Sequence, residues 1–151
     1  MKRHIPLAAV LALAIALPAA AQFRKPEDAV KYRQSVMFVM SNNLYTRIGG
    51  MVNGRIPYDA HAAATSADTV VFLSRLPWDA FIPGTENVGR TDAKPGIWTE
   101  PAKFKDLQEK MQSEVLKLAQ VTKTGDLEAL KVAYRATTAA CKNCHDSYTS
   151  Q

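Results

Sequence analysis

The segment Cys141-Lys142-Asn143-Cys144-His145 places two thiols and an imidazole next to one another in the sequence. On a helix each residue turns by about 100°, so Cys144 lies about 60° to one side of Cys141 and His145 about 40° to the other. One helix can therefore present all three groups to a single flat ligand. The pattern C-x-x-C-H is typical of covalent haem c attachment. We predict thioether bonds from Cys141 and Cys144, with His145 as an axial ligand of the iron.

A helical pattern precedes this motif. Apolar and small residues recur at alternating steps of three and four, at Leu127, Leu130, Tyr134, Thr137, Cys141, Cys144 and Tyr148. The alternative interpretation is a thiol-disulfide protein without haem. A thioredoxin-like motif follows a strand and begins a helix, so the long upstream helical pattern favours haem. Zinc is poorly supported, because a closed zinc site usually has four nitrogen or sulfur ligands and the chain after residue 21 holds no more than two Cys and two His.

The first 21 residues have the pattern of a secretory signal peptide. A basic start is followed by an apolar run from Ile5 to Pro18 and by Ala19-Ala20-Ala21, so we predict cleavage after Ala21 and export to a bacterial periplasm. The remaining domain, 22–151, has a formal net charge of +3, because the signal removes two of the basic residues behind the +5 of the whole chain. This small excess without a basic run argues against nucleic-acid binding, and no second apolar run suits a membrane anchor.

Four helical stretches are predicted within 22–151. They run from Pro26 to a stop at Gly49-Gly50, from an N-cap at Asp59 to Leu76, from Pro101 to Thr122, and, after an N-cap at Asp126, from Leu127 to the end of the chain. Between Pro77 and Pro101, four prolines and three glycines predict a crossover without regular structure, and its aromatic residues predict that it packs. The pattern predicts an all-α, four-helix up-down-up-down bundle with a long crossover between the second and third helices.

Two residues of the first stretch bear on a haem site. Arg33 lies in its apolar stripe, so its head either reaches solvent from the end of the bundle or meets a buried anion such as a haem propionate. Met37 follows one helical turn after Arg33. If Arg33 meets a propionate, Met37 faces the distal side of the haem. Its thioether can ligate iron or act as an apolar plug. The plug is favoured, because methionine in a helix stripe is more often a core residue than a ligand.

Several motifs together resemble the cytochrome c prime family. They are Lys25-Pro26-Glu27-Asp28, Arg33-Gln34 with Met37, Pro77-Trp78 through Pro83-Gly84-Thr85-Glu86, Lys94-Pro95, and Cys141 to His145 at the C-terminus. The resemblance covers essentially all of 22–151. It implies one covalent haem c with His145 as proximal ligand, and it places Arg33, Gln34, Thr85, Glu86 and Asp92 around the haem and its propionates. It also implies a homodimer packed through the first and second helices.

The resemblance further implies a five-coordinate iron that binds nitric oxide and carbon monoxide and serves in electron transfer or nitric oxide handling. Its relatives of the c-556 type bind a methionine of the first helix as sixth ligand, and in this chain Met37 would be that methionine in the alternative interpretation. Many members have a basic residue four positions after the haem histidine, where this chain has Thr149. Properties of the proximal side of the haem that depend on that positive charge are therefore not inferred for this chain.

The sequence favours an electron carrier or gas-binding module over an enzyme. No Ser or Cys nucleophile has an orienting base, and an efficient peroxidase needs a distal acid-base group where the first stripe offers Met and Val. The Ala-rich start of the second helix, with Ala63 and Ala67, is the sequence feature that supports the dimer. The redox partner is not indicated by any motif.

Overall fold

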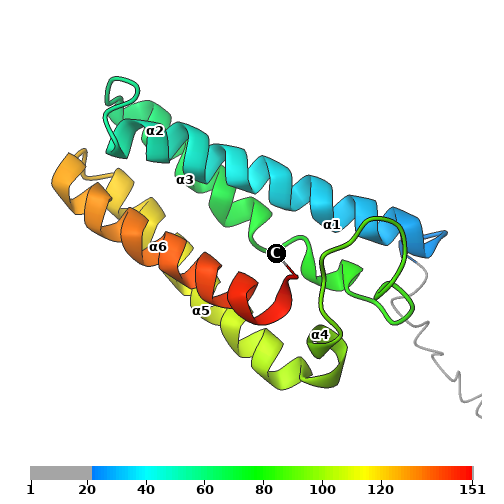
Figure 1. The fold of residues 1–151 in the computed structure, drawn as a ribbon. Helices are drawn as coiled ribbons and strands as arrows, with labels where there is room; N and C mark the ends of the chain where they lie inside the picture. The colour runs from blue at the N-terminus through cyan, green and yellow to red at the C-terminus, as the bar shows by residue number, and fades with distance from the viewer. Residues whose placement is uncertain (1–21, 151) are drawn as a thin grey trace, which may run out of the picture.

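The structure is a computed structural model that describes residues 22–150. Its helices are α1 (Pro26–Ser41), α2 (Gly49–Val52), α3 (Ala60–Leu73), α4 (Gly96–Thr99), α5 (Pro101–Thr122) and α6 (Leu127–Tyr148). A π-helical segment, η2 (Asn42–Ile48), joins α1 to α2, and a short 3-10 turn, η3 (Trp78–Ala80), follows α3. The segments α1, η2 and α2 form one long rod, which packs with α3, α5 and α6 (Figure 1). The predicted all-α four-helix bundle with a long crossover is confirmed.

The core of the bundle follows the predicted apolar stripes. Its largest fully buried aliphatic side chains are Leu44, Ile48, Val70, Val115, Leu118 and Leu130, which come from all four long helical segments. Burying one such side chain contributes roughly 1.5–3 kcal/mol. The predicted N-caps are also confirmed, since Asp59 accepts from the Ala62 amide (3.0 Å) and Asp126 from the Glu128 amide (2.8 Å).

The predicted helix stop at Gly49-Gly50 is wrong, because the helix continues through both glycines. Gly49 has an ordinary helical φ of −62°, and a Cβ added there would lie 2.5 Å from the Tyr134 hydroxyl of α6. This glycine therefore allows α2 and α6 to approach closely. The helix ends instead at Val52, with Asn53 as its C-cap. Gly54 follows with a φ of +69°, the left-handed conformation typical after a helix C-terminus.

Ala63 and Ala67, the two residues of α3 that supported the predicted dimer, are not exposed for contact with a partner subunit. Ala63 and Ala67 are fully buried in the core of their own bundle, where their small side chains let α3 pack closely on η2. The helix also ends at Leu73 and not at Leu76. The Ser74 carbonyl that follows accepts hydrogen bonds from Trp78 Nε1 (2.6 Å) and Gln112 Nε2 (2.9 Å), so it serves the crossover instead of another turn.

The crossover between α3 and α5 packs as predicted, although it contains η3 and α4 where no regular structure was expected. Trp78, Phe81, Trp98, Phe104 and Tyr148 form an aromatic cluster with ring centroids 5.1 to 6.3 Å apart. Residues from the crossover, α5 and the end of α6 therefore meet in one place. This cluster fixes the crossover next to the C-terminal turn of α6, where the sequence motif lies.

Candidate functional site

A cavity lies between α1 and α6, in two adjoining halves of about 610 and 590 Å³. The halves share six lining residues, which are Met37, Met40, Ser41, Met111, Cys141 and His145. One half extends toward η2 and includes Leu44 and Tyr45, and the other extends toward the crossover and includes Trp78 and Asp92. The shared residues show that the two halves adjoin along the C-x-x-C-H motif.

The two cysteines and the histidine reach this cavity from neighbouring positions of α6. Cys141, Cys144 and His145 all line the crossover half, so the helical spacing presents the three groups together as predicted. Both cysteines are free and half-buried, and they lie in the cavity wall. Burial raises the pKa of Cys141 to about 11 and also raises the pKa of Cys144. Exchange-active thiols have lowered pKa values, so this environment argues against a thiol-disulfide site.

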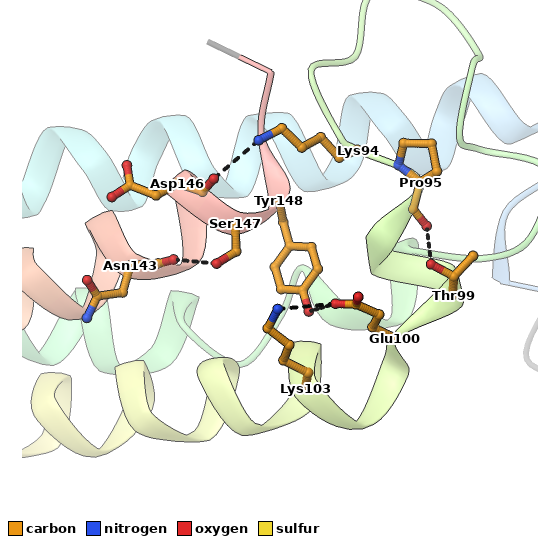
Figure 2. Close-up of polar contacts among 9 residues, drawn as sticks. All are labelled: Lys94, Pro95, Thr99, Glu100, Lys103, Asn143, Asp146, Ser147 and Tyr148. Atoms are coloured by element: carbon orange, nitrogen blue, oxygen red, sulfur yellow. Dashed lines mark hydrogen bonds and ion pairs between the residues drawn. The ribbon is translucent and has the colours of Figure 1, made fainter.

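The last turn of α6 is held from several sides, which fixes the position of His145. The His145 carbonyl accepts from both the amide (2.9 Å) and the hydroxyl (2.8 Å) of Thr149. Tyr148 donates its hydroxyl to Glu100 Oε2 (3.3 Å), which also pairs with Lys103 (Figure 2). Burial raises the pKa of Tyr148 above its usual value, so the phenol can donate up to a higher pH than a free tyrosine. The helix end that carries the imidazole is thus anchored to the start of α5.

Lysine side chains flank the exposed side of the same turn. Lys94 of the crossover donates Nζ to the Asp146 carbonyl at 3.2 Å (Figure 2). Lys142 pairs with both carboxylate oxygens of Asp146 at 2.7 and 2.6 Å. Lys142 and Asp146 also line the η2 half of the cavity, where they pair with each other.

The remaining predicted site residues divide into two groups. Arg33, Gln34 and Asp92 line the crossover half of the cavity, and Met37 lines both halves. Thr85 and Glu86 are absent from the lining residues. Thr85 is fully buried and accepts a hydrogen bond from Arg33 at 2.8 Å, while the charge of Glu86 partly offsets the burial that lowers the pKa of Arg33.

Arg33 is 3% exposed, so the interpretation that its head reaches solvent is wrong. The guanidinium does not reach solvent, because the crossover covers it and supplies its hydrogen-bond acceptors. The sequence could not show this cover, since the acceptors lie about fifty positions further along the chain.

Several lining residues were missed as site residues. The sequence assigned no place at the site to Met40, Ser41, Tyr45, Trp78, Phe104 and Met111. Tyr45 lies in η2, where the wider π-helical turn changes the direction of the following side chains relative to an α-helix. Burial raises the pKa of Tyr45 to about 12, and its hydroxyl lies beside Cys141. Helical periodicity assumes an α-helix, so it gave no signal for this residue.

The residues present fit haem c. Two neutral thiols and an imidazole on one wall face methionines on the other, with apolar side chains between them. Within residues 22–150, no three His, Cys, Asp or Glu side chains gather as a separate metal-ion cluster. The same residues include no helix that is both long and apolar enough to cross a membrane.

Comparison with known proteins agrees with this donor set. The family model for cytochrome c' matches residues 28–149. A cytochrome c' from Alcaligenes xylosoxydans xylosoxydans is 44% identical over 127 residues, which cover 84% of this chain and 97% of that protein. The chain belongs to the cytochrome c' family. As a cytochrome c', it carries covalently attached haem c, so the predicted cofactor is confirmed.

Solved cytochromes c' have the same fold. The crystal structure of cytochrome c' from Rubrivivax gelatinosus superposes with a TM-score of 0.80 at 42% identity, covering 85% of this chain and all of the other. A nitric oxide complex of a cytochrome c prime variant from Alcaligenes xylosoxidans has a TM-score of 0.78 at 42% identity, covering 85% and 98%. A carbon monoxide-bound variant of the same protein has the same TM-score and identity, covering 85% and 99%.

Proposed function

We propose that this cytochrome c' binds nitric oxide and carbon monoxide at a five-coordinate haem iron, and that the same haem serves in electron transfer. The observation that carries the proposal is the cavity in which Cys141, Cys144 and His145 of α6 meet Met37 of α1. Bound there, haem supplies an iron that takes up one electron and binds small gases. Complexes of the Alcaligenes variants with nitric oxide and carbon monoxide support the same ligand class for this chain.

Each side chain has a role in this proposal. Cys141 and Cys144 would hold the haem through thioether bonds, and His145 would ligate its iron. Met37 and Met40 line the cavity from α1 and exclude water with polarizable, apolar side chains. A second candidate is a low-spin carrier of the c-556 type with Met37 as sixth ligand, since Met37 and His145 line the same space.

The proposal describes a binding and electron-transfer protein and not an enzyme. The α1 side chains that line the cavity are those of Arg33, Gln34, Met37, Phe38, Met40 and Ser41. None of them is an imidazole or a carboxylic acid, the groups that most often serve in acid-base catalysis. Rapid, saturable peroxide turnover would contradict this part of the proposal.

We propose the bacterial periplasm as the location and 22–151 as the mature domain. The predicted signal peptide, residues 1–21, lies outside the described residues. The basic start, apolar run and Ala19-Ala20-Ala21 support export. Amino-terminal sequencing of protein recovered from a periplasmic extract tests both points, and a mature chain that begins elsewhere than Gln22 would contradict the cleavage site.

Carbon monoxide titration tests the gas-binding proposal. The reduced protein is expected to bind one carbon monoxide for each haem, because the sixth position is closed only by an apolar plug. The visible spectrum should change along a single saturating curve, and the same should hold for nitric oxide. A spectrum that stays unchanged at saturating carbon monoxide would contradict the open site and support the c-556-type alternative.

We also propose a homodimer through α1 and α3, now on different residues from those that the sequence suggested. Among the described residues, the large apolar side chains exposed on these helices are Phe38, Val39 and Phe72. Phe72→Glu is expected to weaken the dimer by about 2 kcal/mol, roughly thirtyfold in Kd, because the interface would bury an unpaired charge. Sedimentation equilibrium measures the change.

Val132→Glu is the matched control for this test. Val132 is 61% exposed on α6, close to the 64% of Phe72, so the same charge is introduced on a different helix. Equal weakening by both substitutions would place the interface elsewhere, and a monomeric wild-type protein at high concentration would remove the dimer altogether.

A further inference from the structure

An exposed tyrosine lies at the mouth of the η2 half of the cavity. Tyr45 belongs to the π-helical segment η2, lines this half and is 41% exposed. Its hydroxyl lies beside Cys141, the first of the two haem-attachment residues. Segments of π-helix are rare and often occur at functional sites. Tyr45 therefore gives a short path from solvent to the place where haem attaches.

Three basic side chains lie near Tyr45. Arg55 Nη2 donates to the Tyr45 carbonyl at 3.3 Å, and the charge of Arg55 partly offsets the burial that raises the pKa of Tyr134 on α6. Arg135 and Lys142 of α6 line the η2 half, and all three basic side chains are exposed. They come together because α2 contacts α6, which runs beside the rod of α1, η2 and α2 (Figure 1). We call Tyr45, Arg55, Arg135 and Lys142 the η2 rim.

The η2 rim has little opposing charge. From Ala29 to Tyr58 the sequence contains four Lys or Arg residues and no Asp or Glu. Among the ion pairs within residues 22–150, Lys142 pairs with Asp146, whereas neither Arg55 nor Arg135 takes part in one. Two guanidinium groups are thus available for carboxylates of another molecule. Arginine binds a carboxylate through two parallel hydrogen bonds.

We propose that the η2 rim is the docking surface for an acidic redox protein, which exchanges one electron with the haem beside Tyr45. The inference rests on the electron-transfer part of the proposed function and deepens it by naming the class of partner. One protein is oxidised and the other reduced, and no proton or covalent bond changes. Tyrosine and arginine are among the residues that contribute most to binding at protein interfaces. Complementary charge mainly speeds the encounter, which suits a carrier that must release its partner.

Two small redox reagents of opposite charge test the η2 rim in the holoprotein. Hexacyanoferrate(III) is an anion and stands in for the acidic partner, whereas tris(phenanthroline)cobalt(III) is a cation. Each takes one electron from the reduced protein, and stopped-flow absorbance gives the rate. At an ionic strength of about 10 mM the Debye length is about 30 Å, so the charges of the rim are little screened.

Arg55→Gln and Arg135→Gln are each expected to slow oxidation by hexacyanoferrate(III) about threefold and to speed oxidation by the cobalt reagent about threefold, because each removes one positive charge near the path of the electron. Both effects should shrink as salt is added. A folding defect would not change the two rates in opposite directions. Arg75→Gln is the matched control, since Arg75 is exposed but lines neither half of the cavity. It should leave both rates at the wild-type values.

Poly-L-glutamate tests the same surface with a polypeptide. Fluorescence anisotropy of the labelled polymer measures its binding to the holoprotein at low salt. The double variant Arg55→Gln/Arg135→Gln is expected to bind it about tenfold more weakly than the wild type, because two charge-assisted contacts are lost. Arg75→Gln should bind the polymer as the wild type does.

The proposal is overturned if the rim variants change the two oxidation rates in the same direction or leave both unchanged, or if the double variant binds poly-L-glutamate as tightly as the wild type. None of these measurements uses carbon monoxide or nitric oxide. A protein that binds neither gas but shows the opposite rate changes would reject the gas-binding proposal and keep this one. Efficient oxidation by both reagents, independent of Arg55 and Arg135, would keep electron transfer and reject this docking surface.

Discussion

Replacing both Cys141 and Cys144 with alanine is expected to abolish covalent haem in protein produced with a working haem-maturation system. Each thiol lines the cavity and is the only group there that can form a thioether on its side of the motif. Each single substitution removes one of the two bonds, so haem should remain attached through the other. Intact mass spectrometry and haem staining of a denaturing gel measure the attachment directly.

Asn143→Ala is the matched control for the cysteine variants. Asn143 lies between the two cysteines, but it is exposed and lines neither half of the cavity. Its backbone carbonyl accepts a hydrogen bond from the Ser147 hydroxyl at 3.1 Å (Figure 2). This variant should keep the full haem mass. Haem retained by the double cysteine variant, or wild-type protein whose mass shows a disulfide and no haem, would contradict the assignment of Cys141 and Cys144.

Substitution of Met37 is expected to decide the coordination of the iron. With an apolar plug, Met37→Leu should leave the ferric spectrum high-spin, because leucine fills a similar volume and neither side chain ligates. Met37→Ala should open the cavity and raise the carbon monoxide association rate on the order of tenfold, equivalent to about 1.4 kcal/mol less barrier. Electronic spectra and flash photolysis measure the two effects.

Met40→Leu is the control for this series, since Met40 also lies on α1 and lines both halves of the cavity. It should change neither the spin state nor the ligation. The opposite result is equally distinct. A low-spin ferric wild type with a methionine-to-iron charge-transfer band, lost in Met37→Leu and kept in Met40→Leu, would assign Met37 as sixth ligand and make the protein a c-556-type carrier.

The features that the sequence predicted correctly are those that depend on neighbouring residues. The steps of three and four predicted the four helices, because burial on one face of a helix repeats with the helical turn. The caps at Asp59 and Asp126 could be located because a short side chain satisfies amides only two or three positions away. The alignment of Cys141, Cys144 and His145 follows from helical geometry alone, so the sequence also predicted which groups would enter the cavity.

The features that it did not predict depend on contacts between distant segments. A side chain at Gly49 would clash with Tyr134 of α6. No residue near Gly49 in the sequence indicates that Tyr134 packs there. Ala63 and Ala67 have the composition of either a core or an interface, and only the packing of α3 on η2 assigns them to the core. Small side chains permit close packing but do not identify the surface that is packed.

Arg33 illustrates the division most clearly. Its place in an apolar stripe was enough to infer that a buried guanidinium needs partners, because an isolated charge is costly away from water. The partners themselves, on Ala80, Thr85 and Thr91, lie 47 to 58 positions away and meet Arg33 only when the crossover folds over α1. The sequence by itself determined the helices, the caps and the haem-binding motif, which are local consequences of backbone geometry. Tertiary structure alone decided which segment surrounds each buried polar group, because that choice depends on how the whole chain packs.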